Sequence, residues 1–446
     1  MPSPQRILYQ SSFFFPLWIF LSLLLWGSRH NARADTPTVP SPCSLQKISK
    51  DVPYSYATSD DGSLLALASL TSKQKRTRRP WTDPSYTEQF FLLDTRRQKR
   101  KKIASHTYKG RGRIPHVAMD ASGNKVVFSS AGNPTGENTD GNLEIFLFDV
   151  ISKIRSQVTR TIDSDNFGPV MNADGTRIAF LTNTNPVGEL TDSHTVLTLL
   201  DLTTGSATEV ARTTAFPSSI WGFSLNGDGT KIALASNLDL TGANADGTIE
   251  IFLWDAATQT FTQITNAVQT EIRSGNHFSP VLNDDGTRIV FESTENYVSE
   301  NDDGSREIFL FDIIADTFTQ ITHGALNFEL GGFAMSADGT RIVFAGDENL
   351  LVDPNTPRTV SDSNDSEIFL YNTRTNSLTQ LTKSAGESRA PAISADGTQI
   401  AFTVVHVSAV LLAGADLNGY NSGTSQGKKS QKTMDPTAGI YLATCP

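Results

Sequence analysis

The sequence repeats one turn motif seven times, at intervals of 52 to 61 residues. Each copy begins with Asn, Asp or Ser, ends in Gly, and precedes an alternating strand such as Arg177-Ile178-Ala179-Phe180. Because Asx side chains bond the local backbone and Gly accepts a positive φ, each copy predicts a tight turn between antiparallel strands. An array of such turns constrains the chain to a repeat architecture. The copies are residues 59–62, 120–123, 172–175, 226–229, 283–286, 336–339 and 394–397.

Two further strand patterns recur within the repeat. The first is apolar and aromatic, of the type Glu-Ile-Phe-Leu-x-Asp, and the second is Gln-x-Thr. The continuous apolar character of the first indicates a strand covered on both faces, as in stacked sheets. With the strand before each turn there are four antiparallel strands per repeat, which predicts an all-β, seven-bladed β-propeller. The first pattern occupies residues 144–149, 250–255, 307–312 and 367–372, and the second 157–159, 263–265, 320–322 and 380–382.

The order of these patterns resembles the TolB-type propeller repeat over nearly all of residues 43–446. The shared succession is Pro, then Ser/Asn-x-Asp-Gly-Thr-Lys/Arg-Ile-Ala/Val-Phe, then the aromatic strand, then Gln-Ile-Thr. Two features depart from the family: its common Pro before Asp-Gly is replaced, and TolB has an additional N-terminal α/β domain that has no counterpart here. The resemblance therefore implies the fold and an envelope setting, and not the particular role of TolB.

Residues 1–34 have the pattern of a secretory signal peptide, with Arg6, an apolar run at residues 13–26 and the small-x-small sequence Ala32-Arg33-Ala34. A membrane anchor is the alternative, but a span needs about 20 apolar residues. We expect residues 35–446 to form a single propeller, periplasmic or secreted, monomeric, and without a transmembrane segment after cleavage. The formal net charge of −10 disfavours a nucleic-acid partner.

The last repeat runs out of chain after its third strand, residues 439–444. The missing strand is found at the other end of the sequence, where residues 45–49 align with residues 261–265. The N-terminal segment is therefore predicted to complete blade 7 as its outermost strand, which removes unpaired edges from the ring joint. The same alignment places Cys43 and Cys445 on the two sides of a tight turn, and so predicts a disulfide.

Two segments depart from the repeat: a basic insertion at about 71–113 in blade 1 and a flexible insertion at about 406–438 in blade 7. Residues 73–113 hold 14 Lys and Arg against three Asp and Glu. Such a run is usually a solvated face, and the functional alternative is a patch that binds lipopolysaccharide, acidic glycans or an acidic protein. The patch comprises Lys73, Lys75, Arg76, Arg78, Arg79, Arg96, Arg97, Lys99, Arg100, Lys101 and Lys102.

Resemblance to propeller enzymes yields no catalytic residue. Similar propellers cap prolyl-oligopeptidase-type enzymes, but no α/β-hydrolase segment follows the last repeat here. Oligogalacturonate lyase is a second propeller enzyme with a similar repeat, and that resemblance implies a His-bound metal. However, His116, His194, His277, His323 and His406 share no metal-ligand spacing.

Acidic loops in three repeats alternate oxygen-bearing side chains around a Gly turn. This pattern resembles part of a Ca²⁺ loop, although the bidentate Glu at the twelfth position is missing. Asx turns that bond their own backbone explain the same residues without metal, so Ca²⁺ is an alternative and no other cofactor is expected. The candidate ligands are Asn138, Asp140, Asn142, Asn244, Asp246, Asn301 and Asp303.

A second candidate surface is the mouth of the propeller. Each innermost strand enters near the axis, so the residues just before it ring one face. Aromatic side chains with an Arg suit a binding rim, and packing between blades is the alternative role for them. The rim candidates are Tyr54, Phe167, Trp221, His277, Phe278 and Arg389.

The sequence favours a non-enzymatic scaffold of the bacterial cell envelope that binds a protein or a glycan. The expected partner is an envelope protein or an anionic glycan or lipid surface. Two alternatives stay open: a carbohydrate lyase or hydrolase that uses the mouth, and a Ca²⁺-dependent adhesion module. An enzyme would need a convergent set of His, carboxylate or metal ligands, which the sequence alone does not assemble.

Overall fold

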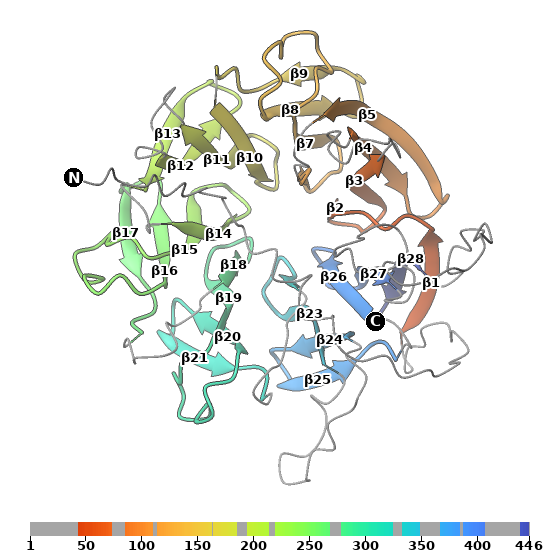
Figure 1. The fold of residues 1–446 in the computed structure, drawn as a ribbon. Helices are drawn as coiled ribbons and strands as arrows, with labels where there is room; N and C mark the ends of the chain where they lie inside the picture. Colours follow the sequence, from red (N-terminus) through yellow and green to blue (C-terminus); the bar gives the residue numbers. More distant parts are fainter. Residues whose placement is uncertain are drawn as a thin grey trace, which may run out of the picture.

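Every regular element of the described chain is a β-strand, and the strands form seven four-stranded antiparallel sheets around a common axis (Figure 1). The predicted seven-bladed β-propeller is confirmed. Residues 1–42, with the predicted signal peptide, and residues 406–437 lie outside the described part of the chain. The computed structural model describes residues 43–73, 85–109, 114–162, 164–184, 194–213, 219–267, 278–323, 332–347, 366–383, 387–405 and 438–445.

Blades 1 to 4 run from the innermost to the outermost strand in chain order. Blade 1 contains β2 (Ser55–Thr58), β3 (Leu64–Lys73), β4 (Ser85–Asp94) and β5 (Lys99–Lys109). Blade 2 contains β6 (Val117–Met119), β7 (Lys125–Ser130), β8 (Glu144–Asp149) and β9 (Arg155–Gln157). Blade 3 contains β10 (Ser164–Met171), β11 (Arg177–Thr184), β12 (His194–Asp201) and β13 (Ala207–Arg212). Blade 4 contains β14 (Ile220–Leu225), β15 (Lys231–Ser236), β16 (Glu250–Asp255) and β17 (Thr260–Gln263).

Blades 5 and 6 follow the same order, whereas blade 7 takes its outermost strand from the N-terminal segment. Blade 5 contains β18 (Phe278–Leu282), β19 (Arg288–Ser293), β20 (Glu307–Asp312) and β21 (Thr317–Gln320). Blade 6 contains β22 (Phe333–Met335), β23 (Arg341–Asp347), β24 (Ser366–Asn372) and β25 (Ser377–Gln380). Blade 7 contains β26 (Glu387–Ile393), β27 (Gln399–Val405), β28 (Gly439–Thr444) and β1 (Ser44–Ser49).

The hydrophobic core of the described chain lies between the blades. Its buried apolar side chains form seven clusters, and each cluster joins two neighbouring blades. At the junction of blades 1 and 2, for example, the rings of Phe90 and Phe128 lie 4.3 Å apart. Each second and third strand contributes to the clusters on both of its faces, which explains its continuous apolar pattern.

Blade 1 differs from the sequence interpretation of residues 71–113 as an insertion. β3, β4 and β5 are 10, 10 and 11 residues long, so parts of that segment continue the sheet. Period-two alternation maintains β5 beyond the basic run, because His106 and Tyr108 are half-buried while Ser105 and Thr107 are exposed.

Seven backbone hydrogen bonds tie the repeated turns into a closed ring. In each turn the amide of the second residue donates to the carbonyl of the equivalent residue in the next blade, at 2.8 to 3.0 Å. These bonds fasten the ends of all the innermost strands at one face, which we call the turn face. The opposite face, at which the innermost strands begin, is the entry face. The linked residues are Asp60, Ala121, Ala173, Gly227, Asp284, Ala337 and Ala395.

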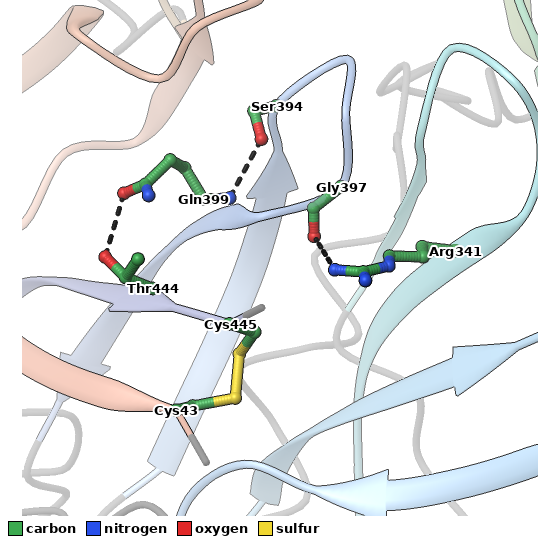
Figure 2. Close-up of a disulfide and its surroundings, with 7 residues drawn as sticks. All are labelled: Cys43, Arg341, Ser394, Gly397, Gln399, Thr444 and Cys445. Atoms are coloured by element: carbon green, nitrogen blue, oxygen red, sulfur yellow. Dashed lines mark hydrogen bonds between the residues drawn. A yellow bond between two sulfur atoms is a disulfide. The ribbon is translucent and has the colours of Figure 1, made fainter.

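In five blades, a Lys or Arg at the start of the second strand donates a hydrogen bond to the carbonyl of the turn glycine in the next blade. Figure 2 shows one example, in which Nη1 of Arg341 donates to the Gly397 carbonyl at 3.1 Å. The turn glycine has a left-handed backbone in every repeat, with φ of 74° at Gly397. Leu64 and Gln399 replace the cation in blades 1 and 7. The other four pairs are Lys125 with Gly175, Arg177 with Gly229, Lys231 with Gly286, and Arg288 with Gly339.

The ring closes as predicted from the sequence. β1 pairs antiparallel with β28, and Ser44 lies opposite Thr444. Cys43 and Cys445 form a disulfide across this joint, with their Cα atoms 4.3 Å apart and 402 residues between them in the chain (Figure 2). The side chain of Thr444 also donates to Gln399 of β27 at 3.0 Å, which ties the last strand to its inner neighbour.

Candidate functional site

The entry face is built on one repeated position of the innermost strands, four residues before each turn motif. Six blades have Ser, Gly or Ala at this position, and blade 2 has His116. Small residues allow neighbouring innermost strands to approach closely: a Cβ added to Gly222 would lie 3.0 Å from the Cα of Ser279 in the next blade. The seven equivalent residues are Ser55, His116, Gly168, Gly222, Ser279, Gly332 and Ala390.

Three of these strands are bulged at the same place, a feature that the sequence analysis missed. Gly168, Ser279 and Ala390 have φ of 62°, 51° and 51°, and each precedes a proline and a register shift in the strand pairing. A left-handed conformation costs a non-glycine residue about 1–2 kcal/mol. Backbone strain of this kind is concentrated at binding and catalytic sites, which directs attention to the entry face.

The rim candidates divide by what they contact. Tyr54 stands just before β2 and is 54% exposed. Phe167 on β10 packs on the core cluster between blades 3 and 4, and Trp221 on β14 packs on that between blades 4 and 5. Phe278 begins β18, although its side chain is outside the described part of the chain, as is all of His277.

Arg389 is the cation of this rim. It lies opposite Thr403 in the pairing of β26 with β27. Ala401, two residues before Thr403 on the same face of β27, packs on blade 1, so this face looks toward the junction of blades 7 and 1. Its side chain is 30% exposed and forms an ion pair with Glu387, which is 13% exposed. The Nε atom of Arg389 is buried and has no hydrogen-bond partner among the described residues.

Blade 1 contributes a tyrosine to the same junction. The Tyr56 hydroxyl donates to the carbonyl of Ala390, the residue after Arg389, and lies 3.2 Å from the Ala401 carbonyl. Burial raises the pKa of Tyr56 far above its ordinary value, so its hydroxyl remains a donor at physiological pH. This contact holds the strained turn of β26 against β2.

His116 carries the imidazole nearest to the axis in the described chain. Its Nδ1 atom is buried without a hydrogen-bond partner among the described residues. Burial lowers the pKa of His116, and the backbone at Ile114 opposes this effect in part. The ring is therefore neutral at physiological pH, with an unprotonated nitrogen that can accept a proton.

Glu292 is a second buried titratable group near the entry face. It lies opposite Phe278 in the pairing of β18 with β19 and is 6% exposed. One of its carboxylate oxygens is 4.0 Å from Nη1 of Arg306. Burial raises the pKa of Glu292 to about 7, and the Arg306 charge opposes the shift.

The turn face carries both acidic side chains and the five cations that donate to the turn glycines. Asp60 and Asp284 are the two acidic members of the hydrogen-bonded ring of turns. Burial raises the pKa of both carboxyl groups, and the charge of Asp284 raises that of Asp60 further. Six of the seven turns also carry Asp at their third position.

The acidic loops proposed for Ca²⁺ are occupied by their own hydrogen bonds. Nδ2 of Asn244 donates to the carbonyls of Leu238 and Thr248, and the Thr248 hydroxyl donates to Asp246. Asn301 and Asp303 are used in the same way in blade 5, by the segment around Ser305. In blade 2 Asn138 donates to Asn142, but Asn142 replaces the hydroxyl residue, so Oδ1 of Asn138 has no donor among the described residues.

The described residues contain no group of three or more His, Cys, Asp or Glu that could hold a metal ion. Asp140 lies in the blade 2 loop and is exposed.

The described histidines do not converge. His194 contacts the Thr213 carbonyl through Nδ1 at 2.7 Å, and His323 lies 3.8 Å from Glu300 on the outside of blade 5. His406 is outside the described residues. Residues 423–427, Gly-Thr-Ser-Gln-Gly, have the spacing of a hydrolase nucleophile motif, but they also lie outside the described chain.

The basic patch is divided between described and undescribed residues. Lys75, Arg76, Arg78 and Arg79 are outside the described chain, and Lys73 ends β3. The second run forms the turn between β4 and β5 and the start of β5, on the outer edge of blade 1 (Figure 1). Three of its members form ion pairs: Arg96 with Asp61, Arg97 with Asp94, and Arg100 with Asp51. The remaining members, Lys99, Lys101 and Lys102, are exposed.

Among the described residues, no helix is long and apolar enough to cross a membrane. No family model matches the chain, and no curated protein sequence matches it.

Solved structures share the fold. An oligogalacturonate lyase in complex with manganese has 14% sequence identity and a TM-score of 0.56, over 93% of this chain and 96% of that one. An oligogalacturonate lyase from Vibrio parahaemolyticus has 13% identity and a TM-score of 0.54, over 93% and 99%. TolB from Acinetobacter baumannii is also among the structural neighbours, with 13% identity and a TM-score of 0.40 over 85% and 80%.

Proposed function

We propose that this protein binds an acidic oligosaccharide, one that contains uronate residues, at the entry face of the propeller. The observation that carries the proposal is the state of Arg389. Its guanidinium is held by Glu387, retains 30% exposure, and has an unused buried donor at Nε. Arg presents planar donors that match a carboxylate, and such pairs discriminate strongly between acidic and neutral sugars.

The surroundings of Arg389 suit a sugar ligand. Tyr54 offers an exposed aromatic ring at the start of the adjacent innermost strand, and aromatic rings pack on the apolar faces of pyranose rings. The strained backbone at Ala390 is fixed by Tyr56, so the position of Arg389 is set before a ligand arrives.

The comparisons support a carbohydrate ligand over a protein partner. Two solved structures that match with a TM-score above 0.5 are oligogalacturonate lyases, and each is matched over nearly its whole length. Their named substrate is an oligosaccharide of a uronic acid. The envelope or extracellular setting is part of the proposal, and the Cys43–Cys445 disulfide supports it because such bonds persist in oxidising compartments.

Lyase activity is the second candidate, and His116 favours it. β-Elimination from a uronate requires a base that removes the C5 proton next to the carboxylate and a cation that stabilises the resulting charge. The 4-O-linked sugar then departs as a double bond forms between C4 and C5, and its oxygen takes up a proton from the protonated base or from water. A neutral imidazole with a free nitrogen can supply the base, and a guanidinium the cation. Although one of the lyases binds manganese, the described residues do not provide a matching ligand group, so no step here is derived through a metal.

Titration calorimetry with oligogalacturonate tests the binding proposal, with a neutral maltooligosaccharide as the uncharged probe. We expect binding of the acidic probe alone, and a loss of about tenfold or more in affinity for Arg389→Ala, because a charge-assisted hydrogen bond contributes about 1.5–3 kcal/mol. Arg374→Ala is the matched control, since Arg374 is 72% exposed on an outer turn of blade 6. Equal losses in both variants, or no binding by the parent protein, would contradict the proposal.

The ultraviolet absorbance of unsaturated products separates binding from cleavage in the same samples. If the protein is a lyase, His116→Gln abolishes product formation while oligogalacturonate still binds. If no product forms with the parent protein, the binding function stands and the lyase candidate is rejected.

A further inference from the structure

Two exposed isoleucines project from the turn between β8 and β9 of blade 2. Ile151 is 73% exposed and Ile154 is 63% exposed. Among the described residues, few large apolar side chains are this exposed, and these two lie three residues apart. Blade 5 offers an internal comparison, because Ile314 occupies the position equivalent to Ile151 and is 80% exposed, but it lies between Asp312 and Asp316.

The isoleucines are surrounded by cations from two blades. Lys153 and Arg155 lie in the same hairpin and are exposed. The neighbouring turn, between β4 and β5 of blade 1, adds the exposed side chains of the second basic run. We call the combined surface the basic–aliphatic edge; it consists of Arg96, Arg97, Lys99, Lys101, Ile151, Lys153, Ile154 and Arg155.

Specific contacts place the two turns side by side. Nε of Arg155 donates to the Ile103 carbonyl of β5 at 2.7 Å. The Lys101 ammonium lies 5.6 Å from the centroid of the Phe148 ring, and the Arg155 guanidinium 5.8 Å from the same centroid. Figure 1 shows β5 and β9 as the outer strands of adjacent blades. These contacts join the β8–β9 hairpin to β5, so the cations of blade 1 and the isoleucines of blade 2 lie on adjacent hairpins.

The edge has a net positive charge in a chain whose formal charge is −10. Six cations face three nearby acids, of which Asp61 and Asp94 are paired with Arg96 and Arg97. Asp149, the third acid, accepts hydrogen bonds from its own turn, which hold its pKa below the ordinary value. Lys99, Lys101 and Lys153 have no ion pair among the described residues and can meet an external anion.

We propose that the basic–aliphatic edge docks on an anionic lipid bilayer. Lys and Arg contact the lipid headgroups, and Ile151 and Ile154 insert between them into the acyl boundary. A soluble polyanion would satisfy the cations but would leave the two isoleucines in water, whereas a bilayer accommodates both. The edge lies at the outer rim of the turn face, where Arg96 pairs with Asp61 of the blade 1 turn. This proposal is independent of the carbohydrate proposal.

Sedimentation with phosphatidylglycerol–phosphatidylcholine vesicles tests the proposal, using the mature, disulfide-bonded protein. We expect binding at low salt that weakens as salt is raised, and no binding to pure phosphatidylcholine. Lys99→Ala should lower the partition coefficient about fivefold, since one cation near an anionic surface contributes about 1 kcal/mol. The double variant Ile151→Ser/Ile154→Ser should lower it at least about tenfold, because less apolar surface is buried.

Ile314→Ser is the matched control, since it removes an equally exposed isoleucine from the same turn position of another blade. It should bind vesicles like the parent protein, and thermal melting should show all variants folded. The proposal is overturned if the parent protein does not bind the anionic vesicles, or if it binds heparin but not vesicles. It is also overturned if the double isoleucine variant binds as well as the parent, or if Ile314→Ser weakens binding equally.

Discussion

Two single residues that break the internal repeat place titratable side chains near the entry face. Glu292 is a carboxylate at a position of the second strand where every other blade has a small or apolar side chain or a hydroxyl. His116 breaks the repeat on the innermost strand in the same way. Comparison of the seven repeats therefore reveals which residues differ from their equivalents, and both Glu292 and His116 lie near the entry face. The residues equivalent to Glu292 are Ala68, Ser129, Leu181, Ala235, Ala345 and Thr403.

The pKa of Glu292 predicts a pH-dependent stability. The pKa rises from 4.5 in an unfolded chain to about 7 in the folded protein, so the folded state binds the proton more tightly. This contribution to the free energy of unfolding is complete below pH 4.5 and is lost as the pH rises to about 7. A shift of this size corresponds to about 3 kcal/mol. We expect Glu292→Gln to remove this decline in urea unfolding measured across that range.

Glu300→Gln is the control for this experiment, because the Glu300 side chain is 60% exposed. Its unfolding should follow the parent protein at each pH. A Glu292→Gln variant that retains the full decline would assign the pH dependence to other groups.

Contacts of individual residues could be predicted from the sequence where the hydrogen-bond partner lies only a few residues away in the chain. The turns were identified because the Asn172 side chain accepts from the amides of Thr176 and Arg177 only a few residues away. The role of Arg177 itself was missed, since its acceptor, the Gly229 carbonyl, is 52 residues further along the chain. The Arg389–Glu387 pair was also missed, because Glu387 is absent from the rim pattern of aromatic residues.

At the scale of strands and turns, the cation that joins neighbouring blades makes a measurable contribution. Arg341→Met removes the charged hydrogen bond to the Gly397 carbonyl but keeps an apolar stem over the turn. We expect the free energy of unfolding to fall by about 1–2 kcal/mol, because the carbonyl loses a charged donor at a half-buried site. Urea unfolding measures the change.

Arg374→Met provides the comparison for Arg341→Met. Arg374 belongs to the same blade but forms an exposed pair with Asp338, and such pairs contribute about 0–1 kcal/mol. If the two variants are destabilised equally, the contact between blades has no special role.

The strands themselves were predictable to different degrees. The second and third strands have strong apolar patterns and were found where the structure has them, as in β19 and β20. The length of β5 was underestimated, because a run of Lys and Arg hides the alternation that resumes at Ala104. The bulges at Gly168, Ser279 and Ala390 were missed, since a proline in an innermost strand does not by itself reveal a left-handed residue before it.

At the scale of the whole molecule, stability depends on closing a ring. The described chain has one core cluster at each junction and one backbone bond between each pair of turns, so no blade has a core of its own. Blade 7 differs from the other blades because its sheet combines both ends of the chain. Closure could be predicted from the sequence because the strand missing from one end was present at the other.

The Cys43–Cys445 disulfide should stabilise blade 7, because it joins the ends of β1 and β28 within that sheet. It links residues 402 positions apart, so it restricts the unfolded chain over almost its whole length. The chain-entropy model gives about 6 kcal/mol for such a loop, and measured effects of disulfides are typically about 2–4 kcal/mol. We expect the double variant Cys43→Ser/Cys445→Ser to lose about 2–4 kcal/mol in urea unfolding, with β1 and β28 the first strands to exchange amide hydrogens. Dithiothreitol should destabilise the parent protein to the same extent and leave the double variant unchanged, which separates loss of the bond from damage by the serines. Two free thiols in the native protein, or equal stability of the parent protein and the variant, would show that strand pairing alone holds the ring closed.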